Sequence, residues 1–429
     1  MALVSTDFAN IQAAIDAAAA PGGGGEVVIP PGEHRSGPIV LPSNFTLTLH
    51  DGATVMFDDD PALYKPVWTR WEGVECWAMQ PLIYIPSAEN VTIKGKGTFD
   101  GAGQSWWHRL RDKRAAGQTG PIEPFELALA ELNPGFETAA DGGGGRKIQY
   151  LRPPLLQPYK SRNLKFEDFT LRNSPFWTLH PVYCQDIIIK NLHVENPADS
   201  HNTDAIDLDS CSRVLIEDCI LDVGDDGVTI KSGSGPDGVR VGIPTTDVTV
   251  KNCTVYAAHG GVVIGSETAG GIENIKVDGC KFIGTERGIR LKTRRGRGGT
   301  IKNIEIRNIV ADKVWCPITF NMYYRPGLKP EDKDFETLTS IEAQPVTPTT
   351  PHIDGVTIEN VNATNVRSAA AFIVGLPEAP IKNVSITNFN YRLAPADQLL
   401  PTSEAAMTGG LFADDDRGIK VINAQAAFH

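Results

Sequence analysis

The feature that most constrains the fold is a series of short, mutually similar segments that recur along most of the chain. Each reads apolar–polar–apolar, as in Val91–Lys94 and Leu164–Glu167. Further copies begin at Ile187, Val214, Val248, Ile275, Ile304, Val356 and Val384. From residue 164 onward their starts lie roughly 23 to 34 residues apart, except for one gap of about 52. One alternating strand in each unit of this length is typical of a solenoid.

The unit length also distinguishes between repeat folds. A propeller blade needs four strands in about 40 to 45 residues, and these units are too short for that. The sequence therefore predicts an all-β fold, a right-handed parallel β-helix that forms a single domain over residues 1–429. Apolar side chains would stack inside this helix, and polar ones would line its lateral surface.

Other segments would cap or interrupt the coils. A short N-terminal helix is predicted to cap the first coil, with Thr6 or Asp7 as its N-cap and with Pro21 and Gly22–Gly25 ending it. The apolar stripe of this helix comprises Phe8, Ile11, Ile15 and Ala18. Two insertions, roughly 101–160 and 322–352, break the period, and long loops on a solenoid tend to gather on its functional face.

Composition excludes several classes of function. The 429 residues include 40 basic and 52 acidic side chains, a net charge of −12, which disfavours nucleic acid as a partner. No run of about 18 apolar residues occurs, so no membrane span is expected. The N-terminus lacks a basic region followed by an apolar stretch, so no signal peptide is expected. The protein would be cytoplasmic, or periplasmic or secreted if an export signal has been removed. A homo-oligomer is compatible with this composition.

The seven cysteines are scattered and form no C-x-x-C pair. This argues against zinc and thioredoxin-like chemistry, and several cysteines recur at matching places in the repeat, as small buried thiols would. We therefore expect no metal and no cofactor.

The segment Val223–Gly233 reads V-G-D-D-G-V-T-I-K-S-G and is the first candidate for chemistry. Repulsion between Asp225 and Asp226 should raise the pKa of one of them, as a general acid near neutral pH requires. Strand alternation would turn Asp226 inward together with Val228, so Gly227 must break the strand if both carboxylates are to face a groove. The alternative is a solvated Asp-Asp-Gly turn.

Three further motifs fall on neighbouring coils: Asn202-Thr203-Asp204, Ala258-His259-Gly260-Gly261 and Arg290-Leu291-Lys292. Residues one coil apart stack at about 4.8 Å, so the motifs should form one site. Taken singly, they also fit an Asx turn, a turn histidine and a solvated strand face. Arg290 and Lys292 project together and suit a substrate that carries carboxylates.

The four motifs together resemble glycoside hydrolase family 28, the polygalacturonases. The resemblance implies a right-handed parallel β-helix that hydrolyses α-1,4-galacturonosidic bonds in pectin with inversion. It implies Asp225 as the general acid, Asp204 and Asp226 as the carboxylates that activate water, and His259 as the support of the acid. Asn202, Arg290 and Lys292 would bind substrate. This sequence departs mildly from the family pattern, with Gly227 where Cys is common, Ala258 for Gly and Leu291 for Ile.

One assignment within the site has a rival. The alternation of Ile206 and Leu208 favours Asp207, rather than Asp204, as an outward carboxylate of its coil. The motif match favours Asp204, which we keep as the prediction.

The mode of attack follows from two longer strings, Thr69–Tyr84 and Arg290–Gly299, which look more like bacterial exo-acting members. Large aromatic side chains could close one end of the groove and admit only a non-reducing chain end. These are Trp68, Trp71, Trp77, Trp106 and Trp107. The alternative is that they bury against the barrel and leave the groove open. A basic cluster would draw pectate to this acidic chain, namely Arg290, Lys292, Arg294, Arg295 and Arg297.

Other functions also fit parts of the sequence. Within the same family these are an endo-polygalacturonase and a hydrolase of rhamnogalacturonan or xylogalacturonan. A pectate lyase would share the β-helix but would use calcium and leave unsaturated products. A carbohydrate-binding solenoid such as a phage tailspike would have a groove without an acid–base pair.

Overall fold

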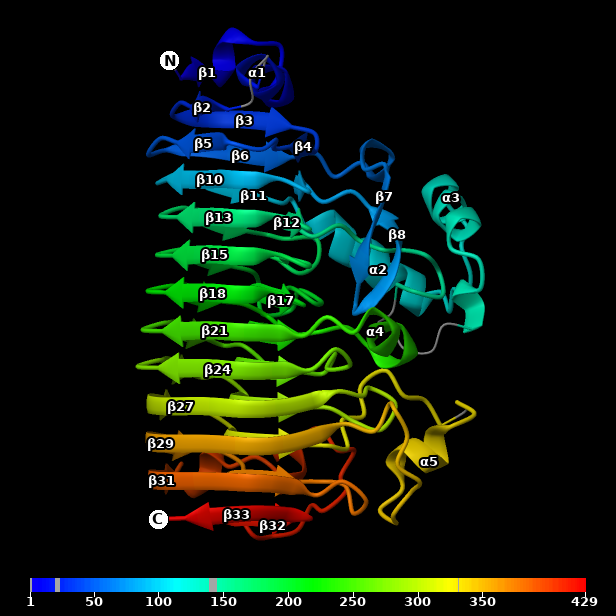
Figure 1. The fold of residues 1–429 in the computed structure, drawn as a ribbon, viewed down its shortest axis with the longest axis vertical. Helices are drawn as coiled ribbons and strands as arrows, with labels where there is room; N and C mark the ends of the chain where they lie inside the picture. Colours follow the sequence, from blue (N-terminus) through cyan, green and yellow to red (C-terminus); the bar gives the residue numbers. More distant parts are fainter. Residues whose placement is uncertain (1, 20–23, 139–144, 331) are drawn as a thin grey trace. The chain divides into compact units, whose positions relative to one another are not determined.

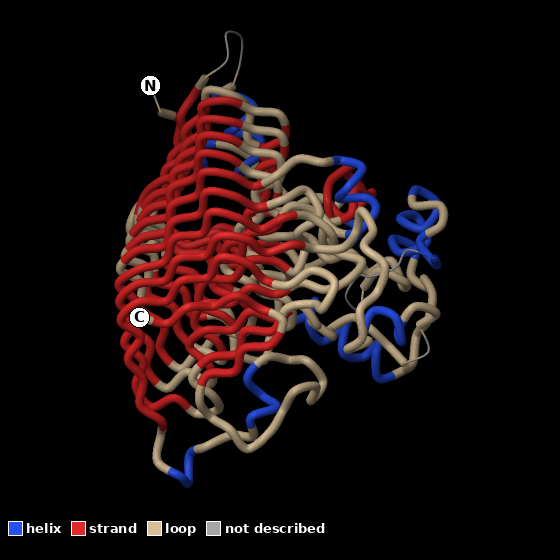
Figure 2. Tube along the Cα trace, turned by 60° about the horizontal axis from the view of Figure 1, so that its bottom comes forward, coloured by secondary structure: helices blue, strands red, loops and turns tan. Residues whose placement is uncertain are grey.

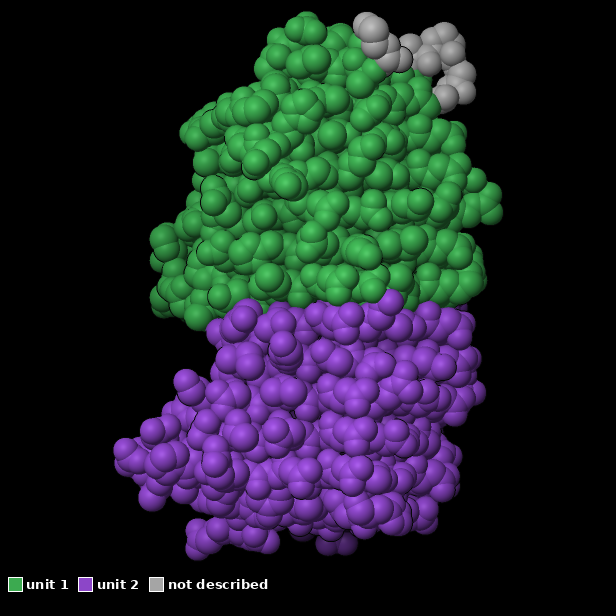
Figure 3. Space-filling view, turned by 90° about the vertical axis from the view of Figure 1, so that its left-hand side faces the viewer, with its two compact units in different colours: residues 1–207, 211–224 green, residues 208–210, 225–429 purple. Residues whose placement is uncertain are grey.

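The protein folds as a right-handed parallel β-helix, mostly strand with few helices, as predicted (Figure 1). The structure is a computed structural model that describes residues 2–19, 24–138, 145–330 and 332–429. The chain divides into two compact units, one of residues 1–207 and 211–224 and the other of residues 208–210 and 225–429 (Figure 3). The organisation of residues 1–429 as a single domain stays a prediction.

Unit 1 contains three parallel sheets, whose strands pair in the order given. The first is β1 (Leu3–Val4), β2 (Gly25–Ile29), β5 (Phe45–Leu49), β10 (Glu89–Gly95), β13 (Arg162–Glu167), β15 (Gln185–Lys190) and β18 (Ser212–Glu217). The second is β3 (Gly32–Ser36), β6 (Ala53–Phe57), β11 (Thr98–Asp100), β14 (Thr170–Arg172), β16 (His193–Glu195) and β19 (Ile220–Asp222). The third is β4 (Ile39–Val40), β9 (Ile83–Pro86) and β12 (Leu156–Tyr159).

Unit 2 repeats the pattern. Its longest sheet is β21 (Thr245–Lys251), β24 (Ile272–Asp278), β27 (Thr300–Asp312), β29 (His352–Val366), β31 (Ile381–Leu393) and β33 (Ala424–Phe428). β22 (Thr254–Tyr256) pairs with β25 (Lys281–Ile283), which pairs with the second half of β27. The third sheet is β20 (Asp226–Lys231), β23 (Gly260–Gly265), β26 (Arg287–Lys292), β28 (Cys316–Asn321), β30 (Ala371–Val374) and β32 (Ile419–Ile422). β17 (Ile206–Asp209) has residues in both units.

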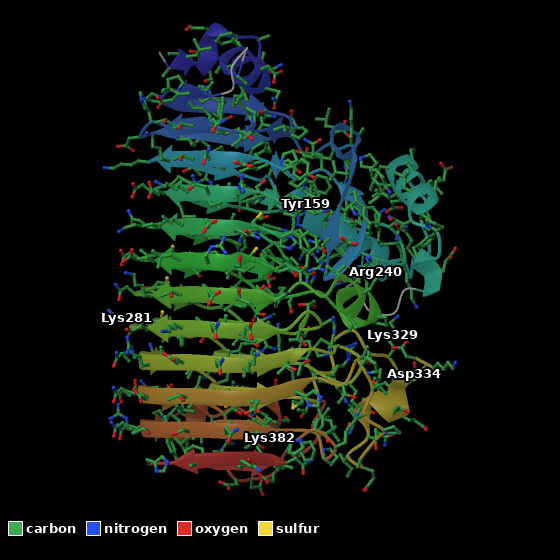
Figure 4. All side chains as sticks on the ribbon, viewed as in Figure 1. Tyr159, Arg240, Lys281, Lys329, Asp334 and Lys382 are labelled. Carbon is green, nitrogen blue, oxygen red and sulfur yellow. The ribbon has the colours of Figure 1, made fainter. Side chains whose placement is uncertain are left out.

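The repeat in the sequence is the stacking of these coils. In unit 1, Val91 lies beside Leu164, which lies beside Ile187, and all three are buried. Figure 2 shows the strands of successive coils side by side. Polar positions between them face solvent, as do Lys281 on β25 and Lys382 on β31 (Figure 4). Alternation thus fills the interior with aliphatic side chains.

Asparagine recurs because the turns between strands need left-handed backbone. Asn90 and Asn163 have φ angles of 57° and 55°, which Asn tolerates better than most residues. Their side chains also bond from coil to coil, since Asn163 donates to Asn90, and Asn90 donates to the side chain of Asn44 at 2.7 Å.

The N-terminal helix α1 (Ile11–Ala18) forms, but its cap differs from the prediction. Asn10 is the N-cap, and its side-chain oxygen accepts from the backbone N–H of Ala13 at 2.8 Å. Thr6 and Asp7 instead lie in a 3₁₀ turn, η1 (Ser5–Asp7), because helical backbone begins later than the apolar stripe suggested. Pro21 and Gly22 and Gly23, expected to end the helix, lie outside the described residues.

Several elements of unit 1 lie outside the coils. Between β11 and β12 the chain forms α2 (Gln104–Ala115), α3 (Pro124–Leu132) and η3 (Phe136–Thr138). Between β6 and β9 it forms η2 (Pro61–Leu63) and an antiparallel hairpin of β7 (Pro66–Trp71) and β8 (Val74–Met79). This hairpin was not predicted from the sequence.

Unit 2 has excursions of its own: α4 (Gly235–Val241), α5 (Phe335–Thr339), η4 (Ala396–Gln398) and η5 (Thr402–Ala405). The segment between β28 and β29 contains α5, and Lys329 and Asp334 mark it in Figure 4. Arg295 holds this segment against the coils, because its guanidinium donates to the Ser340 carbonyl at 2.6 Å and pairs with Glu378 at 2.5 Å.

The seven cysteines are buried, as expected, and none of them forms a disulfide: Cys76, Cys184, Cys211, Cys219, Cys253, Cys280 and Cys316. Among the described residues, no helix combines the length and the apolar character that crossing a bilayer requires.

Candidate active site

Asp226, the first residue of β20, is fully buried and bonded to two cations. One carboxylate oxygen lies 2.9 Å from Nη1 of Arg290, and the other lies 2.5 Å from Nζ of Lys292. Burial acts to raise the pKa of Asp226, but the charges of Lys292 and Arg290 outweigh it and hold the pKa well below the usual range. The two cations therefore favour the ionised form of Asp226.

Gly227 lies within the continuous strand β20, so it does not break the strand as predicted, but it does break the alternation of side chains. A Cβ at Gly227 would lie 2.7 Å from a methyl group of the core residue Val255, and the next residue, Val228, is also fully buried. Two successive inward positions leave Asp226 on the outward side with Arg290. Any larger side chain at Gly227 would collide with the core.

Asp225 precedes β20 and has a different partner. Its carboxylate lies 3.2 Å from Nδ1 of His259, and its backbone carbonyl accepts from the His259 N–H at 2.9 Å. The Asp225 side chain is 20% exposed, against none for Asp226. Asp225 thus lies at the surface side of the pair, where a ligand can reach it.

The expectation that repulsion raises the pKa of one aspartate is wrong. Burial does act to raise the pKa of Asp225, and Asp226 adds to it, but the charge and hydrogen bond of His259 outweigh both. The pKa of Asp225 is therefore lowered, as is that of Asp226. Attraction to the neighbouring cations exceeds the repulsion between the two aspartates. Only the repulsion could be inferred from the sequence.

His259 contacts a second carboxylate that the sequence analysis missed. Nε2 of His259 lies 3.7 Å from Oε1 of Glu286, at a distance that is ionic rather than a hydrogen bond. Burial acts to lower the pKa of His259, but Asp225 and then Glu286 outweigh it, so the pKa is raised. Glu286 stands one coil beyond His259, so the coil register contained the signal for it.

Arg290 and Lys292 project to one side of β26, as predicted, but they are buried and bound to Asp226. Two further residues that the sequence analysis missed contact them. The ring of Tyr324 lies 5.6 Å from the Arg290 guanidinium and 5.2 Å from the Lys292 ammonium, and the sulfur of Met407 lies 2.9 Å from Nη2 of Arg290. Tyr324 and Met407 lie in irregular segments, where no repeat pattern points to them.

The remaining arginines do not form the basic surface that was expected. Arg295 pairs with Glu378, and Arg297 contacts Glu267 at 3.3 Å and donates to the Ser234 hydroxyl at 2.6 Å. Arg294 is 1% exposed. Because these arginines are buried among partners of this chain, they anchor loops rather than attract a polyanion.

A buried ion cluster accompanies the site in unit 2. Lys231, on β20, is buried and lies 3.0 Å from Glu267, which Arg297 also contacts. Burial acts to raise the pKa of Glu267, but Lys231 and Arg297 outweigh it and hold the pKa low. Both oxygens of Asp226 are likewise bonded to cations, an arrangement that disfavours a metal ion there.

Asn202, Asp204 and Asp207 belong to unit 1. Asn202 has a left-handed backbone, with φ 56°, and its side-chain oxygen accepts from Nη2 of the buried Arg152 at 3.1 Å. Asp204 and Asp207 are both buried, at 3% and 0% exposure. Burial does not distinguish them, so the choice of Asp204 over Asp207 stays a prediction from the motif.

Most of the tryptophans expected to close the groove lie in the core of unit 1. Trp71, Trp106 and Trp107 are buried, and Trp71 stacks on Phe176 with ring centroids 4.8 Å apart. Trp68 and Trp77 pair across the β7–β8 hairpin, and Trp68 is 41% exposed. Three of the five are therefore buried, because apolar ring area favours the interior, and the choice between a closed and an open groove stays a prediction.

Known proteins resemble the chain in sequence and in fold. A Vitis vinifera protein named "Probable polygalacturonase" is 29% identical over 387 residues, which cover 88% of this chain and 68% of the relative. An endo-polygalacturonase of Pectobacterium carotovorum subsp. carotovorum is 26% identical over 82% of this chain and 77% of its own. The structure of a hyperthermoactive exopolygalacturonase from Thermotoga maritima matches with a TM-score of 0.79 and 28% identity, covering 100% of this chain and 90% of that one.

The relatives also differ in length and in source. The chain spans only about half the length of several other plant relatives. The expected likeness to bacterial members in particular is not supported, since a plant protein is as similar as a bacterial one.

The chain also matches the sequence profile of a protein family. The sequence profile of glycosyl hydrolases family 28 matches residues 141–388, more than half of the chain, and this span includes all four motifs. The chain therefore belongs to glycosyl hydrolases family 28.

Proposed function

We propose that the protein hydrolyses α-1,4-galacturonosidic bonds in polygalacturonate with inversion and releases units from the non-reducing end. The observation that carries the proposal is the unequal pair on β20. Asp225 contacts the titratable His259, while Asp226 is held ionised by Arg290 and Lys292. Membership of family 28 and relatives named polygalacturonases support the substrate class.

In this proposal Asp225 is the general acid that protonates the leaving oxygen. Asp225 and an imidazolium at His259 share one proton, which can reside on either side chain, so the pair can deliver it to substrate. Asp226, ionised before the reaction, acts with Asp204 to orient and deprotonate the attacking water. An acid on one side of the bond and a base behind the water is the arrangement of an inverting hydrolase.

Arg290 and Lys292 have donors to spare for a uronate carboxylate. Asp226 accepts one N–H from each, and the sulfur of Met407 accepts a second from Arg290, while a guanidinium has five and an ammonium three. The same two side chains would thus hold the base ionised and bind the substrate's own charge. Asn202 is the third substrate-binding residue of the proposal.

Release from a chain end rests on likeness to the Thermotoga maritima exopolygalacturonase, at 28% identity over the whole chain. Internal cleavage is the second candidate, favoured by the burial of Trp71, Trp106 and Trp107, which removes them as groove walls. The Pectobacterium relative bears the name endo-polygalacturonase.

One incubation with polygalacturonate tests the proposal. We expect new reducing ends, no unsaturated product, no effect of a chelator, and an inverted anomer by proton NMR. Monomer should appear early, while viscosity falls slowly. A rapid loss of viscosity would establish internal cleavage, and unsaturated, calcium-dependent products would establish a lyase. No cleavage of polygalacturonate, with cleavage of a branched pectin, would move the substrate to another member of the pectic class.

A further inference from the structure

Three ionisable side chains occupy equivalent positions on successive coils of unit 2. The backbone N–H of His259 donates to the Asp225 carbonyl at 2.9 Å, and that of Arg287 donates to the His259 carbonyl at 3.2 Å. Glu286 precedes Arg287, so Asp225, His259 and Glu286 form a column. The imidazole of His259 lies between two carboxylates, at 3.2 Å on the Nδ1 side and 3.7 Å on the Nε2 side.

Glu286 is held in place from behind. Its other oxygen bonds to Nη1 of Arg287, whose side chain is 1% exposed. Arg287 is fixed in turn, because its remaining nitrogens donate to the carbonyls of Glu404 at 2.5 Å and of Ala405 at 3.2 Å. The orientation of the Glu286 carboxylate toward Nε2 is thus built into the fold.

The charges that act most strongly on His259 are three carboxylates. Asp225 and Asp226 approach from β20 and the residue before it, and Glu286 from the residue before β26. Arg287 and Arg290, on β26, face Glu286 and Asp226 rather than the imidazole. Glu286 is therefore the one carboxylate among these groups that contacts the imidazole without belonging to the aspartate pair.

We propose that Glu286 is a positioning residue that keeps His259 protonated and aims its Nδ1–H at Asp225, and so sets the alkaline limit of the reaction. This inference rests on the proposed function. It gives Glu286 no contact with substrate.

The proton balance is simple. As the C1–O bond breaks, Asp225 gives the leaving oxygen the proton that it has received from Nδ1 of His259, which leaves Asp225 ionised and His259 neutral. The water that attacks C1 loses a proton to Asp226 or Asp204. That proton passes to solvent, and solvent reprotonates His259, so the net reaction consumes one water. At pH values where His259 is neutral, the supply of protons to Asp225 fails.

The test replaces Glu286 by Gln, which keeps the shape and removes the charge. We expect the alkaline limb of kcat/KM for polygalacturonate to move down by about 0.5 to 1 pH unit, as loss of one nearby, partly screened charge does. Activity on the acid side should stay within about twofold. In protein with ¹³C-labelled histidine, the NMR titration of His259 should move down by the same amount, with the signal assigned from His259→Gln.

Two further variants complete the design. Glu286→Asp keeps the charge but moves it away from His259, so it should shift the alkaline limb and the His259 titration by smaller amounts. This variant replaces Glu286→Gln in the test if Glu286→Gln does not fold. Glu273→Gln removes a carboxylate of unit 2 that pairs with Lys302 at the surface, and it should move neither. An unmoved limb and an unmoved His259 titration in the Glu286 variants would overturn the inference, while wild-type hydrolysis would still uphold the proposed function. If the wild type cleaved no pectic substrate, the proposed function would fail, and with it the catalytic part of the inference.

Discussion

The two sides of the candidate site differ in what holds their carboxylates. On the Asp226 side, a fully buried carboxylate is bonded to Arg290 and Lys292, whose charges do not change in the ordinary pH range. On the Asp225 side, a partly exposed carboxylate contacts His259, whose charge does change. The ionisation of Asp226 is therefore supported by fixed charges, whereas that of Asp225 depends on whether His259 is protonated.

This difference assigns roles that the sequence could not separate. A base must stay ionised, which permanent cations ensure, whereas an acid needs a proton nearby, which an imidazolium can hold. The lowered pKa of Asp225 depends on the charge of His259 and is relieved when the proton moves across. Substitutions on the Asp225 side and on the Asp226 side should therefore differ in their effects on rate, stability and pH dependence.

The largest expected effect is that of Asp225→Asn. Loss of the acid should lower kcat by about 10²- to 10⁴-fold, since an amide cannot protonate the leaving oxygen. Because this side chain is partly exposed, the midpoint of thermal unfolding should change little. Initial rates and a thermal melt on the same preparation measure both. Turnover near that of the wild type would remove Asp225 from the acid role.

Asp226→Asn should cost both rate and stability. The rate should fall at least about 10²-fold with the loss of the base. The change also leaves two buried cations without a carboxylate, and breaking a buried pair in this way costs about 3–5 kcal/mol. The free energy of unfolding from denaturant titration tests this. If Asp225→Asn and Asp226→Asn lost equal stability, the contrast between the two sides would be wrong.

Lys292→Met sharpens the Asp226 side further. The Michaelis constant for polygalacturonate should rise about tenfold, the effect of losing one charge-assisted contact of about 1.4 kcal/mol. The pKa of Asp226 should also rise, so the acid limb of kcat should move to higher pH. A rise in the Michaelis constant with an unmoved acid limb would mean that Lys292 serves the substrate alone. Lys276→Met, at an exposed position of β24, is the control.

The sequence predicted the fold well because the β-helix repeats its local rule. Apolar residues such as Val248, Ile275 and Ile304 mark each coil, and their register in the structure is the one that the spacing implied. The N-cap and the β7–β8 hairpin were not predicted, since they depend on contacts that are made once rather than in every coil.

The site was predicted in part for the same reason. Asp225, His259 and the Arg290 strand lie on repeating coils, so their proximity followed from spacing. The charge states of these side chains could not be predicted from spacing, because they depend on partners such as Glu286 and on the burial of Lys292. Met407 could not be found at all, because its segment reaches Arg290 from outside the repeat.

The smallest expected effect is on the pH dependence of stability, where the two sides should govern opposite limbs. Asp226 and Glu267 have lowered pKa values, so their contribution is present above the usual carboxyl range and is lost as the pH falls below about 4. His259 has a raised pKa, so its contribution is present below about 6.5 and is lost as the pH rises through the raised value. The melting temperature should therefore be highest between about pH 4.5 and 6.5, with a steeper fall on the acid side, where several buried carboxylates titrate. Melting curves from pH 3 to 9 measure it, and His259→Gln should flatten only the alkaline limb. An alkaline limb that survives in His259→Gln would show that other groups produce it, and the Asp225 side would then contribute less to stability than its contacts imply.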